Sequence, residues 1–121
     1  MARAAEPMLP ECDPTLLNPD GSFQGTFANF PTLWREFALI TTLARWTVGP
    51  NRPYLRPQSE REPQVVDWIT GAAFVLRRAA YAQVGGLDEA YFMYSEETDW
   101  CWRLHQAGWQ IACLPSVTVM H

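Results

Sequence analysis

The sequence of 121 residues predicts a small α/β domain, because strand-like and helix-like patterns alternate along its second half. A nearly continuous apolar run at 65–76 is typical of a strand covered on both faces. The segments 77–84 and 96–107 have helical patterns and are followed by glycines. A hydrophobic fraction of 48% and six tryptophans favour a packed core over disorder.

The charge and the cysteine content argue against nucleic-acid binding and against a zinc site. The net charge of −4 gives no general attraction to nucleic acid. Cys12, Cys101 and Cys113 form no C-x-x-C pair, which suits a reducing compartment, and a zinc site from Cys101, His105 and Cys113 would lack a known spacing. No signal peptide or membrane-spanning run is visible, so we expect a soluble cytoplasmic domain.

The first part of the chain is predicted to be irregular except for a hairpin and a helix. Residues 1–20 contain four prolines, and the segment 16–23 has apolar residues on both sides of an Asp-Gly pair, which is a hairpin signal. A helix at 31–48 follows, with Thr32 as its cap and an apolar arc so wide that we expect packing on more than one side. The loop at 49–64, rich in proline and arginine, is interpreted as a solvated connector rather than a phosphate contact.

The second part of the chain is predicted to be more regular. Ser95 is a natural N-cap for a helix, and glycine is the residue that most often ends one. In order, we expect a strand at 65–76, a helix at 77–84 ended by Gly85 and Gly86, a helix at 96–107 closed by Gly108, a strand at 109–114, a break at Pro115 and a strand at 117–120.

An acidic cluster opens the helix predicted at 96–107. Glu96, Glu97 and Asp99 lie in its first turn, where carboxylates offset unsatisfied N–H groups and the helix dipole, and Asp99 precedes Arg103 by four residues. A structural role is sufficient to explain these acids. A catalytic role is also compatible, because adjacent helical residues point about 100° apart. One carboxylate can then bind backbone donors while the other acts as a general base in a cleft beside the aromatic run 91–94.

Residues 65–121 resemble the C-terminal, acceptor-side half of family 2 glycosyltransferases, and within them the rhamnosyltransferase-like group. The resemblance implies a nucleotide-diphospho-sugar transferase fold of the GT-A type, with a mixed sheet and flanking helices, from which the N-terminal nucleotide-binding half is absent. Segments 16–23 and 30–33 resemble the part that follows the metal motif in these enzymes. The main similarity is carried by 67–78 (DWITGAAFVLRR), 84–89 (VGGLDE), 91–104 (YFMYSEETDWCWRL) and 107–109 (AGW).

The resemblance implies roles for individual residues. Glu97 corresponds to the catalytic base, a position at which many members carry aspartate, and Glu96 would support it. The other expected roles are acceptor binding for Thr70, Gly71, Ala72, Tyr94 and Trp100, a structural role for Asp88, Asp99 and Arg103, and metal ligation for His121.

We therefore expect a glycosyltransferase fragment that belongs to cell-surface polysaccharide synthesis. The parent enzyme would transfer a sugar from a nucleotide-diphospho-sugar to a hydroxyl of a saccharide or lipid-linked acceptor, with inversion and with Mg²⁺ or Mn²⁺. The family's Asp-x-Asp metal motif has no counterpart here, so the fragment alone is expected to be inactive. The alternatives are a non-catalytic interaction module and self-association through exposed strand edges.

Peripheral attachment to the inner face of the membrane through the helix at 33–46 is a further alternative. We favour core packing for this helix, because Arg35 and Arg45 are its only basic anchors.

Overall fold

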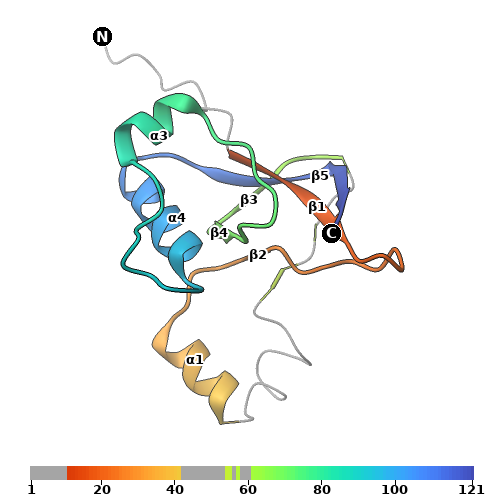
Figure 1. Cartoon of the computed structure of the whole chain (residues 1–121). Coiled ribbons are helices and arrows are strands. Elements are labelled where there is room, and N and C mark those ends of the chain that lie inside the picture. Colours follow the sequence, from red (N-terminus) through yellow and green to blue (C-terminus); the bar gives the residue numbers. More distant parts are fainter. Residues whose placement is uncertain (1–10, 42–53, 56, 58–60) are drawn as a thin grey trace.

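The computed structural model describes residues 11–41, 54, 55, 57 and 61–121. Within these ranges the chain has a mixed three-stranded sheet of order β1-β5-β3, a two-stranded ribbon of β2 and β4, and three helices (Figure 1). The predicted α/β class is confirmed. The elements are β1 (Glu11–Leu17), β2 (Phe27–Ala28), α1 (Leu33–Ile40), β3 (Gln64–Val66), β4 (Trp68–Ile69), α3 (Arg78–Val84), α4 (Glu96–Gln106) and β5 (Ile111–Met120).

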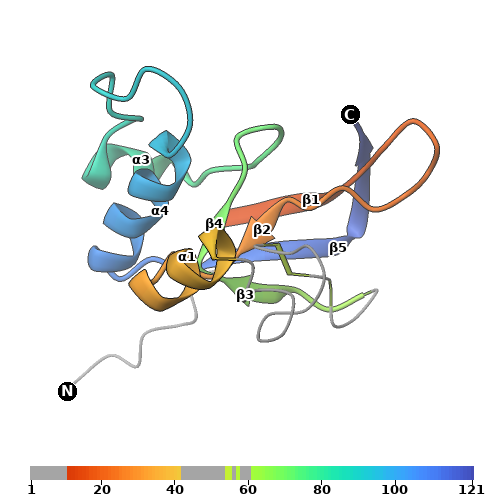
Figure 2. The same ribbon diagram turned by 90° about the horizontal axis from the view of Figure 1, so that it is seen from below.

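The central strand of the three-stranded sheet is β5, which pairs in parallel with β1 and antiparallel with β3 (Figure 2). Two predictions were wrong here. Residues 11–17 are a strand although they were expected to be irregular, and β5 continues through Pro115 instead of breaking there. The pairing register shifts between Pro14 and Thr15, whose partners are Leu114 and Thr118. Pro115 therefore lies in a bulge, where its missing N–H interrupts no ladder.

The apolar run predicted as one strand at 65–76 is divided at Asp67. The segment before Asp67 is β3, which joins β5, and Trp68 and Ile69 after it form β4, which joins β2. The prediction was wrong for residues 70–76, which belong to no named strand. Asp67 accepts a hydrogen bond from the Phe30 amide at its carboxylate (2.8 Å), and its carbonyl oxygen lies 3.0 Å from Nε2 of His105. Because these contacts bind Asp67 to two other segments, the chain turns there from one sheet to the other.

The predicted turn at 16–23 is present. Gly21 has a φ of 79°, which glycine adopts without strain, and its amide donates to the Asn18 carbonyl at 2.8 Å. The hairpin is short, because Leu17 and Phe23 form an isolated antiparallel bridge. The Ser22 hydroxyl and amide both donate to the Asp20 carboxylate, and they lower the pKa of Asp20 below its ordinary value.

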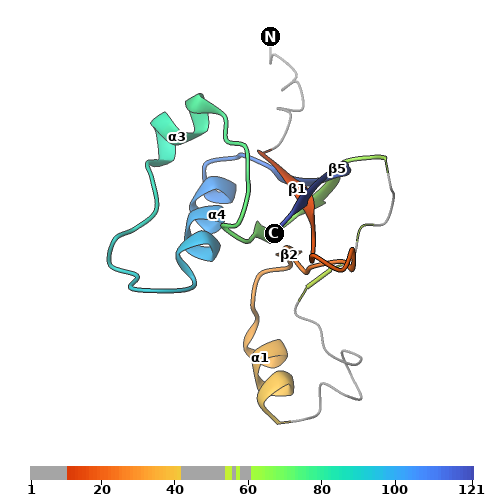
Figure 3. The same cartoon turned by 45° about the vertical axis from the view of Figure 1, so that its right-hand side comes forward.

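Helix α1 begins as predicted, with the Thr32 hydroxyl accepting from the Arg35 amide at 3.3 Å. The predicted continuation from 42 to 48 lies outside the described residues, as does most of the loop predicted at 49–64. The expectation that this helix packs on more than one side was wrong, because Ala38 is the single buried residue of α1. Figures 1 and 3 show why: α1 stands away from the sheets and the other helices.

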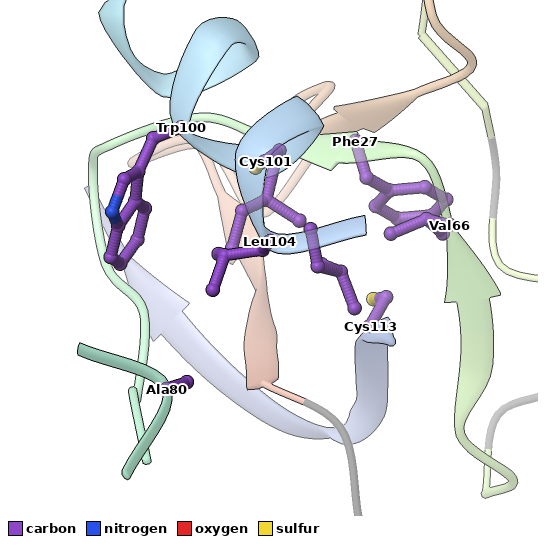
Figure 4. Packing of buried hydrophobic residues seen from close by; sticks show 9 residues of the cluster. Phe27, Val66, Ala80, Trp100, Cys101, Leu104 and Cys113 are labelled. Carbon is purple, nitrogen blue, oxygen red and sulfur yellow. The ribbon is translucent and has the colours of Figure 1, made fainter. Parts of the chain in front are cut away.

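The core lies between α4, α3 and the sheets (Figure 4). Helix α4 contributes Trp100, Cys101 and Leu104, which lie on one face at helical spacing. Cys113 of β5 packs in the same cluster, so both of these cysteines are buried among apolar side chains. Within the described ranges no helix has the length and apolar character needed to cross a bilayer.

Two side chains of α4 fix this helix to the end of α3. Arg103 donates to the Asp99 carboxylate (2.9 Å), to the Val84 carbonyl (3.0 Å) and to the Gly86 carbonyl (2.9 Å). The Trp100 indole N–H donates to the Gly85 carbonyl at 2.8 Å. Three successive carbonyls at the end of α3 are therefore satisfied by α4.

Replacing Gly85 by alanine should destabilise the fold. Gly85 ends α3 with φ 81° and ψ −173°, a conformation that residues with a Cβ rarely adopt. We expect Gly85→Ala to lower the free energy of unfolding by about 1–3 kcal/mol in urea denaturation. Gly86→Ala is the matched control, because its Cβ would meet the Tyr81 ring at an ordinary 3.5 Å. Equal losses in the two variants would contradict this account of the α3 end.

Candidate functional site

A pocket of about 500 Å³ lies between α1, the turn after β4 and the start of α4. The turn contributes Thr70, Gly71 and Ala72, and the start of α4 contributes Glu97. These segments are far apart in sequence, and the ribbon of β2 and β4 brings the turn into place through the hydrogen bond from the Thr70 amide to the Thr26 carbonyl (2.7 Å). The pocket is thus assembled by the tertiary fold.

Glu97 is the acidic residue of α4 whose side chain faces this pocket. It is half-buried, and its Oε1 accepts a hydrogen bond from the Gly71 amide at 3.0 Å. Among the described residues this is the one hydrogen bond of the side chain, so Oε2 remains available to a hydroxyl in the pocket. A carboxylate held at one oxygen and open at the other can orient and deprotonate such a hydroxyl.

Gly71 permits this contact because it has no side chain. A Cβ at this position would lie 2.5 Å from Oε1 of Glu97, closer than Cβ atoms pack in real structures. The glycine therefore lets the backbone of the turn approach the carboxylate and donate its N–H to it.

The residues just before α4 adopt an unusual backbone. Tyr94 and Ser95 have φ values of 66° and 71°, in the left-handed region that residues other than glycine seldom occupy. Ser95 occupies the predicted N-cap position, but its side chain makes no cap hydrogen bond, so that part of the prediction was wrong. The left-handed pair turns the aromatic segment so that the exposed Tyr94 lines the pocket.

The expected acceptor residues do not all lie together. Thr70, Gly71, Ala72 and Tyr94 line the pocket with Glu97. Trp100 does not, because it is 3% exposed and its indole fills the space between α4 and α3 (Figure 4). We therefore assign Trp100 to packing rather than to acceptor contact.

The remaining predicted residues lie away from the pocket. Glu96 does not line it, and its Oε2 is shielded from solvent without a hydrogen-bond partner among the described residues. Asp88 caps a turn by accepting from the Ala90 amide at 2.9 Å. His121 is exposed after β5, and its backbone amide donates to the Leu17 carbonyl at 3.0 Å.

The described side chains do not form a metal centre. Across the described ranges no group of three or more histidine, cysteine, aspartate or glutamate residues could hold a metal ion. In particular, His105 lies against the Asp67 carbonyl and the Phe30 ring, whereas Cys101 and Cys113 are in the core.

Sequence reasoning missed the other walls of the pocket. Arg35, Glu36 and Leu39 line it from α1, and their spacing along a single helix was a signal for a second, more polar face of that helix. Trp68 lines it from β4 and donates from its indole to the Asn29 carbonyl at 3.1 Å. These residues add a cation, an acid and an aromatic surface to the site.

A second hollow of about 310 Å³ adjoins the first and shares Pro31, Ser95 and Thr98 with it. Its walls are aromatic, formed by Phe30, Tyr91 and Trp102. Aromatic faces beside hydroxyl and carboxylate groups can hold a ring-shaped polar ligand.

Comparisons with known proteins identify relatives of this chain. The chain is 36% identical over 109 residues to an N-acetylglucosaminyl-diphospho-decaprenol L-rhamnosyltransferase of Mycobacterium tuberculosis, with 89% of this chain and 36% of the relative covered. It is 31% identical over 88 residues to the rhamnosyltransferase WbbL of Escherichia coli, with 72% and 33% covered. The low-salt glycan biosynthesis hexosyltransferase Agl10 of Haloferax volcanii is 29% identical over 90 residues, with 74% and 25% covered.

The chain is a member of the glycosyltransferases of family 2, and it groups with their rhamnosyltransferase-like members. It spans about a third of the length of its rhamnosyltransferase relatives, 36% and 33% of them. No family model matches the chain, and no solved structure matches it significantly.

Proposed function

We propose that this chain forms the acceptor side of a glycosyltransferase in which Glu97 is the general base. The observation that carries the proposal is the carboxylate of Glu97 at the pocket wall, with Oε1 bound to the Gly71 amide and Oε2 available. A base must lie within hydrogen-bond reach of the proton that it removes, and a hydroxyl in this pocket meets that condition.

The proposed reaction is a single displacement. An acceptor hydroxyl lies in the pocket against Oε2 of Glu97, which takes the proton as the hydroxyl oxygen forms a bond to the anomeric carbon of the donor sugar. The bond from that carbon to the nucleotide diphosphate breaks at the same time, and the diphosphate leaves with the electron pair. Attack from the side opposite the leaving group inverts the anomeric carbon.

The relatives' names suggest the substrates. One relative is named as an L-rhamnosyltransferase that acts on N-acetylglucosaminyl-diphospho-decaprenol. By extension we propose a nucleotide-activated sugar such as rhamnose as donor, a saccharide on a lipid-linked diphosphate as acceptor, and a place in cell-surface polysaccharide synthesis at the cytoplasmic face of the membrane. The aromatic hollow beside the pocket supports a saccharide acceptor, because sugar rings pack their C–H faces on aromatic side chains.

Mg²⁺ or Mn²⁺ is the expected cofactor of the whole transferase, with His121 as the ligand expected from this chain. The described residues do not fit such an ion on their own, because they gather no group of three ligands. We therefore derive no catalytic step of this chain through a metal. The metal requirement of the transferase is a separate prediction, checked by measuring transfer before and after chelation.

Replacing Glu97 by glutamine tests the base directly. Glutamine keeps the size of the side chain and a carbonyl oxygen for the Gly71 amide, but it cannot accept a proton at neutral pH. We expect Glu97→Gln to lower kcat by about 10²–10⁴-fold, with the KM for the nucleotide sugar little changed, in the transferase that carries these residues. Glu89→Gln, an exposed acid outside the pocket, is the control. Unchanged turnover in Glu97→Gln would rule out Glu97 as the general base.

Replacing Gly71 by alanine tests the contact that holds the base. The added Cβ displaces the Glu97 carboxylate, which is the end of a mobile side chain, so the free energy of unfolding should change by less than about 1 kcal/mol. Transfer should nevertheless fall by at least about tenfold, because the carboxylate loses its position. Gly86→Ala, which adds the same methyl group outside the pocket, is the control. Full activity in Gly71→Ala would show that the Gly71 contact does not position the base.

A further inference from the structure

Helix α1 exposes an apolar face to solvent. We call Leu33, Trp34, Phe37 and Ile40 the α1 apolar face; they fall within about 120° of the helix circumference. Leu33 is 93% exposed and Ile40 is 81% exposed, and the rings of Trp34 and Phe37 stack with centroids 5.8 Å apart. No described element covers these side chains, and α1 stands clear of the sheets in Figures 1 and 3. An exposed apolar face of this kind is typical of a surface that contacts a partner or a membrane.

The opposite side of the same helix lines the pocket. Arg35, Glu36 and Leu39 point toward Glu97 and the turn after β4, whereas the α1 apolar face points away from them. Helix α1 is therefore the wall between the proposed acceptor pocket and whatever covers the apolar face. An occupant of that face lies within one helix diameter of the acceptor.

A second exposed apolar segment adjoins the pocket at Tyr94. Phe92 is 97% exposed and Met93 is also exposed, and the next residue, Tyr94, lines the pocket. The pocket thus has exposed apolar side chains on two of its borders. The described charges of α1 are Arg35 and Glu36, which cancel, and the whole chain carries a net charge of −4.

We propose that the α1 apolar face inserts into the surface of a lipid bilayer and thereby places the pocket at the membrane. The lipid surface is favoured because a relative's acceptor is linked to decaprenol, so that the sugar of such an acceptor lies at the height of the headgroups. A protein covering the same face would separate this border of the pocket from the membrane. The identity of the acceptor rests on the proposed function, whereas the apolar face does not.

The composition of the face determines the mode of binding. Tryptophan and phenylalanine are well suited to the boundary between headgroups and acyl chains. A helix of eight residues is too short to span a bilayer, so α1 would lie in the plane of the membrane surface. Because the charges of α1 cancel and the chain is acidic, the attraction is apolar rather than electrostatic. Binding should therefore need no anionic lipid and should resist salt.

Vesicle flotation of the 121-residue chain, and of the transferase that carries it, tests the proposal. Wild-type protein should float with phosphatidylcholine vesicles, equally well with or without phosphatidylglycerol and at low or high salt. The double variant Leu33→Ser/Ile40→Ser should lose at least about tenfold in partition coefficient, because two aliphatic side chains no longer enter the bilayer. Val75→Ser/Met120→Ser removes two apolar side chains that are each 69% exposed elsewhere, and it should bind like wild type. Circular dichroism checks that all variants are folded.

Three results would overturn the proposal: no binding of the wild-type protein, equal binding by the two double variants, or binding that requires phosphatidylglycerol. A dimer seen by light scattering that Leu33→Ser/Ile40→Ser dissociates, with vesicle binding unchanged, would assign the face to a second copy of the chain.

Failure of this proposal can be distinguished from failure of the proposed function. Glu97→Gln should float like wild type although transfer is lost. Leu33→Ser/Ile40→Ser, in the transferase that carries it, should still glycosylate a short, water-soluble acceptor at the wild-type rate.

Discussion

The position of α4, and with it the position of Glu97, depends on the hydrogen bonds that fix α4 to the end of α3. Arg103 and Trp100 donate to the carbonyls of three successive residues, 84–86, and Asp99 holds the guanidinium in position from the preceding turn. A hydrogen bond that involves a charged group contributes about 1.5–3 kcal/mol, and the planar guanidinium makes three at once. With α4 anchored in this way and packed on the core through Leu104, the direction of its first turn is determined.

The first turn of α4 places the carboxylate of Glu97 at the pocket. Tyr94 and Ser95 enter the helix through left-handed conformations, and Glu97 then meets the amide of Gly71 on the turn after β4. Strain of this kind is retained where the surrounding structure enforces it, and such places are often functional. The same pocket is closed on its far side by α1, which carries Arg35 inward and an apolar face outward. One short helix thus connects the proposed chemistry with the proposed membrane surface.

The parts of the fold that depend on local sequence could be predicted, and the parts that depend on distant partners could not. Helices α3 and α4 end at glycines as expected, because capping is a local property. Strand β1 was missed, since its pairing with β5 joins Glu11 to Ile111 across the whole chain and outweighs the prolines. In the site, the resemblance assigned Glu97 and the 70–72 turn to the acceptor side. It could not show that Trp100 packs in the core or that α1 forms a wall of the pocket, because both follow from tertiary packing.

The central claim is that an acceptor hydroxyl binds between Glu97 and the turn at 70–72. The most direct measurement is an amide NMR titration of the chain with a water-soluble saccharide that ends in N-acetylglucosamine. We expect saturable shifts of the Gly71 amide, which donates a hydrogen bond to the carboxylate, and of the amides of Thr70 and Tyr94, with weaker shifts in Glu97→Gln. Saturable shifts confined to α3 or β5, or none at Gly71, would contradict it.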